Sequence, residues 1–211
     1  PTGSGYVEEI DPKAEKAYEQ IRASKTDVAA ISKKTGIPES TLQRIKEHLF
    51  VNEHEIATVA GAPPTKQRFV ANARWSDLWE GAQKGTLKPA ERAELMDLLT
   101  HENVEATLSK KGLYLYEPEI VGPGGQLEGR PFKAQGAHDL AGIAERDFRP
   151  DLIDKMPVEV RQSHLKDMIK ASMEVRGDFP PEMLKNMHPE AQEAYAQILK
   201  EREALQKNPV P

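Results

Sequence analysis

The chain lacks cysteine altogether, which excludes disulfides, thiolate metal ligands and cysteine nucleophiles. It also lacks any apolar run close to the roughly 20 residues that a membrane-spanning helix needs, so we expect no membrane insertion. Basic residues are not in excess, because 29 Lys and Arg stand against 34 Asp and Glu, a net charge of −5. This balance argues against broad electrostatic binding of nucleic acid, so any anion-binding surface has to be local.

Helical periodicity dominates what is present. The 211 residues suffice for one sizeable core with a helical appendage. We predict an all-α fold, with a helical domain over residues 11–145 and a C-terminal helical extension over 146–211. The chain begins at Pro1 without an initiator methionine or a signal peptide, and we interpret it as a fragment of a longer protein. The expected helices span 11–23, 28–35, 38–54, 66–83, 88–110, 135–145, 157–175, 180–186 and 188–206.

Residues 113–133 break the helical pattern. A short aromatic run from Tyr114 to Tyr116 precedes Gly122-Pro123-Gly124-Gly125. This composition predicts an irregular loop or a small β-hairpin, and we expect no other strand-forming stretch. Long irregular loops in compact domains often carry function.

Residues 27–49 match the pattern of a helix-turn-helix unit. Residues 1–60 carry eight Lys and Arg against ten Asp and Glu, which is poor material for neutralising phosphates. Two helices joined by a glycine turn are also a common α-hairpin, so a DNA-binding role and a structural role both stay open. The apolar and turn positions of the unit are Ile31, Gly36, Ile37, Leu42 and Ile45.

A second polar group follows directly, in the run from Lys46 to His54. His48 and Asn52 share a helix face, and His54 lies near the helix end. Histidine titrates close to neutral pH, so this pair is a candidate for acid–base chemistry. In the alternative interpretation, His48 packs in the core and His54 is a surface residue near a helix C-terminus.

The third group is the run His101-Glu102-x-x-Glu105. Residues four apart share a helix face, so His101 and Glu105 point the same way. The run is a zincin signature without its second histidine, which excludes a standard metalloprotease. One histidine and one carboxylate can still supply two ligands to a metal, with His138 as a candidate third. The alternative is an exposed helix with ordinary charges.

Two arginines, Arg68 and Arg74, lie on the expected helix that precedes this run. The arginine guanidinium can hold a phosphate or a carboxylate. Together with Asn52, they are our candidates for substrate binding.

Three segments of the chain form a recognisable pattern. They are Ile31–Ile37 leading into Lys46-x-His48-Leu49-Phe50-x-Asn52-x-His54, then Arg74-Trp75-Ser76-Asp77-Leu78-Trp79, then Leu98-Leu99-x-His101-Glu102. Lys110-Lys111-Gly112 and Ala137-His138-Asp139 continue the pattern, separated by the Gly/Pro-rich loop. Over residues 18–142 this pattern resembles a helical domain found at the C-termini of bacterial polymorphic toxins and phage head-morphogenesis proteins.

The resemblance implies that the scattered polar residues form one cleft. It implies a toxin domain released from a larger delivery protein, secreted or delivered into a target cell, and active in the cytoplasm. A dedicated immunity protein is the implied partner. The residues of the implied cleft are His48, Asn52, His54, His101, Glu102 and His138.

We therefore expect a toxin hydrolase. Either His101 and His48 form the acid–base pair, or His101, Glu102 and His138 bind a divalent metal while Glu102 or Glu105 polarises a water. Nucleic acid is the leading substrate, which predicts a nuclease. The alternative is a non-catalytic helix-turn-helix protein that binds DNA or serves as an adaptor through residues 27–49.

Overall fold

The computed structural model describes residues 11–56, 65–113, 115 and 136–207. These residues form an all-α protein with one two-stranded hairpin. No helix of the described ranges is long and apolar enough to cross a membrane. The elements are α1 (Pro12–Ala23), α2 (Asp27–Thr35), α3 (Glu39–Lys46), η1 (Glu47–Val51), β1 (His54–Ile56), β2 (Thr65–Gln67), α4 (Ala73–Lys84), α5 (Pro89–Lys110), α6 (Ala137–Glu145), α7 (Pro150–Ile153), α8 (Val158–Arg176), α9 (Pro181–Asn186) and α10 (Pro189–Lys207).

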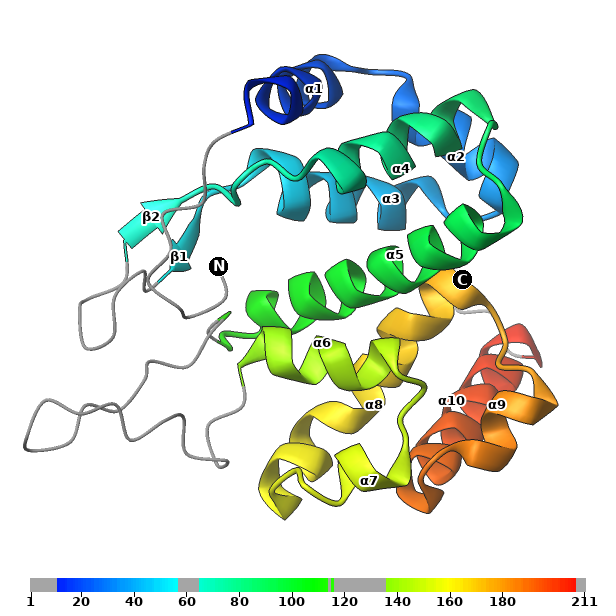
Figure 1. Ribbon diagram of the computed structural model, residues 1–211. Coiled ribbons are helices and arrows are strands. Elements are labelled where there is room, and N and C mark those ends of the chain that lie inside the picture. Colours follow the sequence, from blue (N-terminus) through cyan, green and yellow to red (C-terminus); the bar gives the residue numbers. More distant parts are fainter. Residues whose placement is uncertain (1–10, 57–64, 114, 116–135, 208–211) are drawn as a thin grey trace, which may run out of the picture.

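Helix α5 is the centre of the fold. Figure 1 shows it running between α1 to α4 on one side and α6 to α8 on the other, with α9 and α10 beyond α8. The described residues bury two hydrophobic clusters, and α5 contributes to both. Leu95 and Leu99 join the cluster of α1 to α4, whereas Val104 and Leu108 join the cluster of α6 to α10. Every face of α5 is therefore covered along part of its length, and polar residues of its middle turns become buried.

The second cluster spans residue 145. Leu140 and Ile143 of α6 pack in one core with Ile169 of α8 and Ile198 of α10. The division into a domain over 11–145 and an extension over 146–211 stays a prediction, and the helices on both sides of that boundary share apolar contacts.

The sequence expectations are wrong in the region between α3 and α4. The helix expected to reach residue 54 ends at Val51 in a turn of π-helix, η1, and a helix expected from residue 66 starts only at Ala73. The Asn72 side chain caps α4 by accepting a hydrogen bond from the backbone N–H of Arg74 at 2.9 Å. The intervening residues instead form the antiparallel hairpin β1–β2, with His54 opposite Gln67.

The hairpin also corrects the expectation that only residues 113–133 can form strands. Of that stretch, only residues 113 and 115 are described, and the rest lies outside the described residues. The backbone carbonyl of Leu115 accepts a hydrogen bond from the N–H of His138 at 3.1 Å. This bond ties the described end of the stretch to the first turn of α6.

Helices α2 and α3 are joined by the expected glycine turn, which both a helix-turn-helix unit and an α-hairpin contain. Gly36 ends α2 with φ of +79°, a left-handed conformation that suits glycine. Leu42 and Ile45 of α3 are completely buried. The two basic residues of α3 are engaged inside the protein, because Arg44 contacts Asn103 and Glu174, and Lys46 is buried against Asp27.

Candidate functional site

The candidate site is a buried polar cluster on the middle of α5. Glu102 and Glu105 are only 3% and 2% exposed, and His101 beside them is partly buried. Residues three and four apart on a helix share a face, so these side chains point toward the same neighbours. The covering elements are η1 on one side and α6 on the other, and each of them adds a histidine.

The η1 turn supplies His48. Its widened hydrogen bonding runs from the Asn52 N–H to the Glu47 carbonyl at 2.7 Å, and such π-turns occur often at functional sites. The turn sets His48, which is 4% exposed, with Nε2 at 2.9 Å from Oε1 of Glu105. The same nitrogen lies 3.8 Å from Oε2 of Glu102.

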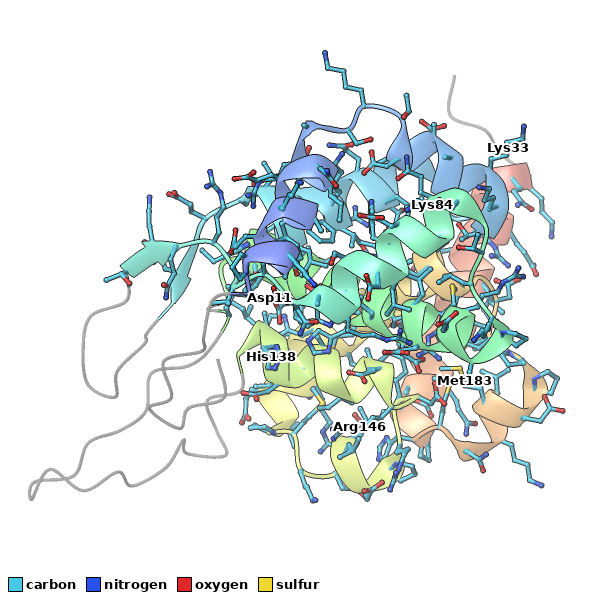
Figure 2. All side chains as sticks on the ribbon, turned by 45° about the horizontal axis from the view of Figure 1, so that its top comes forward. Asp11, Lys33, Lys84, His138, Arg146 and Met183 are labelled. Carbon is cyan, nitrogen blue, oxygen red and sulfur yellow. The ribbon has the colours of Figure 1, made fainter. Side chains whose placement is uncertain are left out.

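Helix α6 supplies His138 from its first turn, labelled in Figure 2. Nδ1 of His138 donates to Oε2 of Glu105 at 2.7 Å. Nε2 of His101 lies 3.1 Å from Nδ1 of His138 and 3.4 Å from Oε2 of Glu105. The two carboxylate oxygens of Glu105 thus face different partners, Oε1 toward His48 and Oε2 toward His101 and His138.

Glu145, the last residue of α6, orients His101. Its carboxylate accepts a hydrogen bond from Nδ1 of His101 at 3.0 Å, and this orientation places Nε2 of His101 toward Glu105 and His138. Arg176 of α8 holds this end of α6 in place. Its guanidinium donates to the Glu145 carbonyl and to Asp147 just beyond it, and also reaches Asp97 on α5.

His54 lies beside the cluster and supports His48 from β1. Nε2 of His54 donates to the backbone carbonyl of His48 at 2.7 Å, and its ring stacks on Phe69 with centroids 4.6 Å apart. Burial and the neighbouring His48 lower the pKa of His54. A neutral His54 with its Nε2 proton engaged fixes the backbone of η1 and contributes no atom to the cluster itself.

Burial and hydrogen bonding separate the pKa values of the two glutamates. Burial and the charge of Glu105 raise the pKa of Glu102 to about 7. Burial acts in the same direction on Glu105, but its hydrogen bonds with His101, His138 and His48 outweigh it and hold the pKa well below the usual value. Burial lowers the pKa of His101, yet its hydrogen bonds with Glu105 and Glu145 raise it to about 10. Such perturbed groups in one place are typical of functional sites.

One carboxylate oxygen in the cluster is unsatisfied. Oε2 of Glu102 is buried and has no hydrogen-bond partner among the described residues. A buried polar atom without a partner costs free energy, so its presence here calls for a ligand or a chemical role.

A cavity of about 400 Å³ opens next to His101 and His138. It lies along α6 and the α7 region, and Figure 2 shows His138 and Arg146 at the two ends of α6. Its wall carries cations, Arg146 and Lys155, as well as acidic groups. The lining residues are His101, His138, Asp139, Gly142, Ile143, Glu145, Arg146, Leu152 and Lys155.

The cluster contains two sets of potential metal ligands. His101, Glu105 and His138 form one set, and His48, Glu102 and Glu105 form the other, with the ligand atoms of each set within 4.8 Å of one another. Imidazole nitrogens with carboxylate oxygens suit Zn²⁺ and other first-row divalent cations. The hydrogen bond from His101 to Glu145 is the carboxylate–histidine arrangement that orients a ligating histidine.

Most of the predicted site residues lie together. The structure brings together His48, His101, Glu102 and His138, and it places His54 directly behind His48. Glu105 rather than Glu102 lies beside His101 and His138.

The predicted substrate-binding residues lie outside the cluster. Asn52 is exposed and ends η1 through its backbone N–H. Arg68 is exposed and donates to the Val51 carbonyl, whereas Arg74 is bound by Glu94. The cations that line the cavity, Arg146 and Lys155, follow α6 in the sequence instead.

The sequence-based candidate residues do not include Glu145. The spacing could have indicated it, because Glu145 follows His138 by seven residues and therefore lies on the same face of a continuous helix.

Known proteins do not place the chain in a family. No family model matches it, and no curated protein and no solved structure shows significant similarity.

Proposed function

We propose that this chain is a toxin domain that acts as a metal-dependent hydrolase. The observation that carries the proposal is the convergence of His101, His138 and Glu105, whose ligand atoms lie within 4.8 Å of one another at the edge of an open cavity. Two histidines and one glutamate are a ligand set that catalytic zinc sites use, with a further position left for water. The delivery protein, the immunity protein and the target-cell cytoplasm remain implications of the family resemblance.

The chemistry of such a centre is hydrolysis. A divalent ion held by these residues would lower the pKa of a bound water and supply hydroxide near neutral pH. Glu145 and Arg176 keep His101 oriented, and the covering elements η1 and α6 keep His48, Glu102 and Glu105 buried. In an ester substrate, hydroxide adds to the electrophilic atom, the bond to the leaving oxygen breaks, and that oxygen takes up the proton that water lost.

The cavity favours an anionic substrate such as the phosphodiester of a nucleic acid. Arg146 and Lys155 line it together with Asp139 and Glu145, and both cations are exposed. A local pair of cations can hold a phosphate even though the chain as a whole is acidic. This supports the nuclease over hydrolases of neutral substrates.

The alternative, duplex binding through α2 and α3, is less well supported. The cations that it needs, Arg44 and Lys46, are held by Glu174 and Asp27. The surface left on α3 includes Glu39, Ser40 and Gln43, and none of these residues offers a positive charge to a phosphate backbone.

Expression of the chain in bacteria tests the proposal. We expect wild type to inhibit growth and to cleave plasmid DNA or total RNA in an EDTA-sensitive reaction, and we expect His101→Ala to lose both activities by at least about 100-fold. His164→Ala is the matched control, because His164 lies on α8 and its electrostatic neighbours are Asp167 and Lys111. A harmless wild type, or a folded His101→Ala protein that stays toxic, contradicts the proposal.

Glu145→Gln should weaken the centre without removing a ligand. A neutral amide replaces the carboxylate that accepts the hydrogen bond from Nδ1 of His101. We therefore expect metal affinity to fall by about 10- to 100-fold. Glu201→Gln is the control, because its side chain is 43% exposed, against 40% for Glu145, and it pairs with Lys166 on another surface. Isothermal titration measures the Zn²⁺ affinity of both variants. Equal affinities of Glu145→Gln and Glu201→Gln for Zn²⁺ would exclude a positioning role for Glu145.

A further inference from the structure

The cluster has a second compartment that the proposed mononuclear centre does not use. It lies between α5 and η1 and contains His48 and Glu102, which are 4% and 3% exposed. These two residues and Glu105 form a complete set of three potential ligands. An explanation in terms of ordinary core packing has to account for a buried carboxylate oxygen of Glu102 that has no partner.

From this compartment we infer that the chain binds a second divalent cation, held by His48, Glu102 and Glu105, with Glu105 bridging the two ions. The inference rests on the metal centre of the proposed function. It assigns the substrate-facing ion to His101 and His138 and the buried ion to His48 and Glu102.

The geometry of Glu105 is that of a bridging carboxylate. Oε1 lies 2.9 Å from Nε2 of His48, and Oε2 lies 2.7 Å from Nδ1 of His138. Each oxygen therefore belongs to a different set of ligands, and neither set has to share an oxygen with the other. In two-metal hydrolases the ions lie about 3.5–4 Å apart, which is a separation that one carboxylate can span.

Glu102 provides the independent observation. Its Oε2 lies 3.8 Å from Nε2 of His48, too far for a hydrogen bond, and Glu102, His48 and Glu105 each offer a ligand atom within 4.8 Å of the other two. A cation among these atoms would satisfy Oε2 of Glu102 and would compensate two carboxylates that are buried three residues apart on one helix.

Two ions would have different roles in hydrolysis. In a two-metal site, one ion stabilises the attacking oxygen and the other stabilises the leaving oxygen of an in-line displacement. This arrangement is typical of enzymes that act on phosphodiesters, and it agrees with the two cations that line the cavity.

The experiment is metal stoichiometry on the full chain, with Zn²⁺ alone as the probe. After treatment with EDTA and reloading, we expect two Zn²⁺ per wild-type chain and one per Glu102→Gln chain, measured by elemental analysis and isothermal titration. Glu102→Gln preserves side-chain size and removes one buried charge, and circular dichroism checks that it folds. Glu94→Gln, an exposed position on the same helix, is the control and should keep two ions.

Mn²⁺ provides a second readout that does not depend on activity. Two Mn²⁺ ions bridged by Glu105 should give an exchange-coupled paramagnetic resonance spectrum in wild type, and Glu102→Gln should give the spectrum of isolated Mn²⁺. His48→Asn should also give the spectrum of isolated Mn²⁺, because it removes the histidine ligand of the buried ion.

The outcomes separate this inference from the proposed function. One ion per wild-type chain, or unchanged stoichiometry in both Glu102→Gln and His48→Asn, overturns the second site, and EDTA-sensitive hydrolysis would then still support a mononuclear hydrolase. Two coupled ions without any hydrolysis or toxicity would support the second site and refute the proposed function.

Discussion

An Asp27→Ala variant is expected to lose about 3–5 kcal/mol of unfolding free energy, because it leaves the buried Lys46 ammonium without its carboxylate partner. Asp27 is 1% exposed and lies 2.9 Å from Nζ of Lys46, which is 4% exposed. The second carboxylate oxygen accepts the indole N–H of Trp79 at 2.9 Å. The substitution therefore removes two buried contacts, the ion pair between α2 and α3 and the hydrogen bond from Trp79 of α4.

Urea denaturation followed by tryptophan fluorescence measures this loss. Asp178→Ala is the control, because Asp178 is 55% exposed in its pair with Arg202, and exposed ion pairs contribute at most about 1 kcal/mol. Adding Lys46→Met to Asp27→Ala should recover part of the stability, since it removes the stranded charge. A loss below about 1 kcal/mol for Asp27→Ala would mean that the buried pair does not stabilise the packing of α2 on α3 and α4.

The burial of Asp27 is a feature that the sequence does not predict. The residues before α2 predict a helix start, and α2 does begin at Asp27. Nothing local predicts that this carboxylate is buried, because its partners Lys46 and Trp79 lie 19 and 52 residues away. Helical periodicity identifies elements with good reliability, whereas the burial of a charge depends on tertiary packing.

In the candidate site, too, the sequence predicts local features and the tertiary contacts appear only in the structure. The spacing of His101 and Glu105 predicts a shared helix face, and the structure confirms that their side chains meet, at 3.4 Å. The π-turn that positions His48 has no signal in the 3.6-residue pattern, and the expected helix to residue 54 misses it. The resemblance predicts that the histidines lie together, but the position of Glu105 between them is known only from three-dimensional distances.

The pairing of His101 with Glu145 likewise needs the tertiary structure. The two residues lie 44 positions apart on α5 and α6. The periodicity of each helix indicates its own apolar face but not its register against the other helix. Only the packing of α6 on α5 shows which residues of the two helices face each other.

Glu105→Gln is expected to have the largest effect on function. The amide keeps one acceptor oxygen and replaces the other with an NH₂ donor, so it cannot face His48 on one side and His101 and His138 on the other as an acceptor. Loss of an orienting partner already costs about 10- to 100-fold in such sites. Loss of a direct ligand should therefore reduce hydrolysis and Zn²⁺ affinity by at least about 100-fold.

Thermal and chemical denaturation with and without Zn²⁺ measure the effect independently of catalysis. An ion that binds only the folded chain stabilises it by about 2.7 kcal/mol when its concentration is 100 times the dissociation constant. Wild type and Glu94→Gln should show this stabilisation, since Glu94 is an exposed residue of the same helix. Glu105→Gln should show almost none, and in EDTA it should lose about 1–3 kcal/mol because a buried hydrogen-bond acceptor is missing. Equal stabilisation of Glu105→Gln and wild type by Zn²⁺ would place the ion elsewhere and would remove Glu105 as the ligand on which both sets of histidines converge.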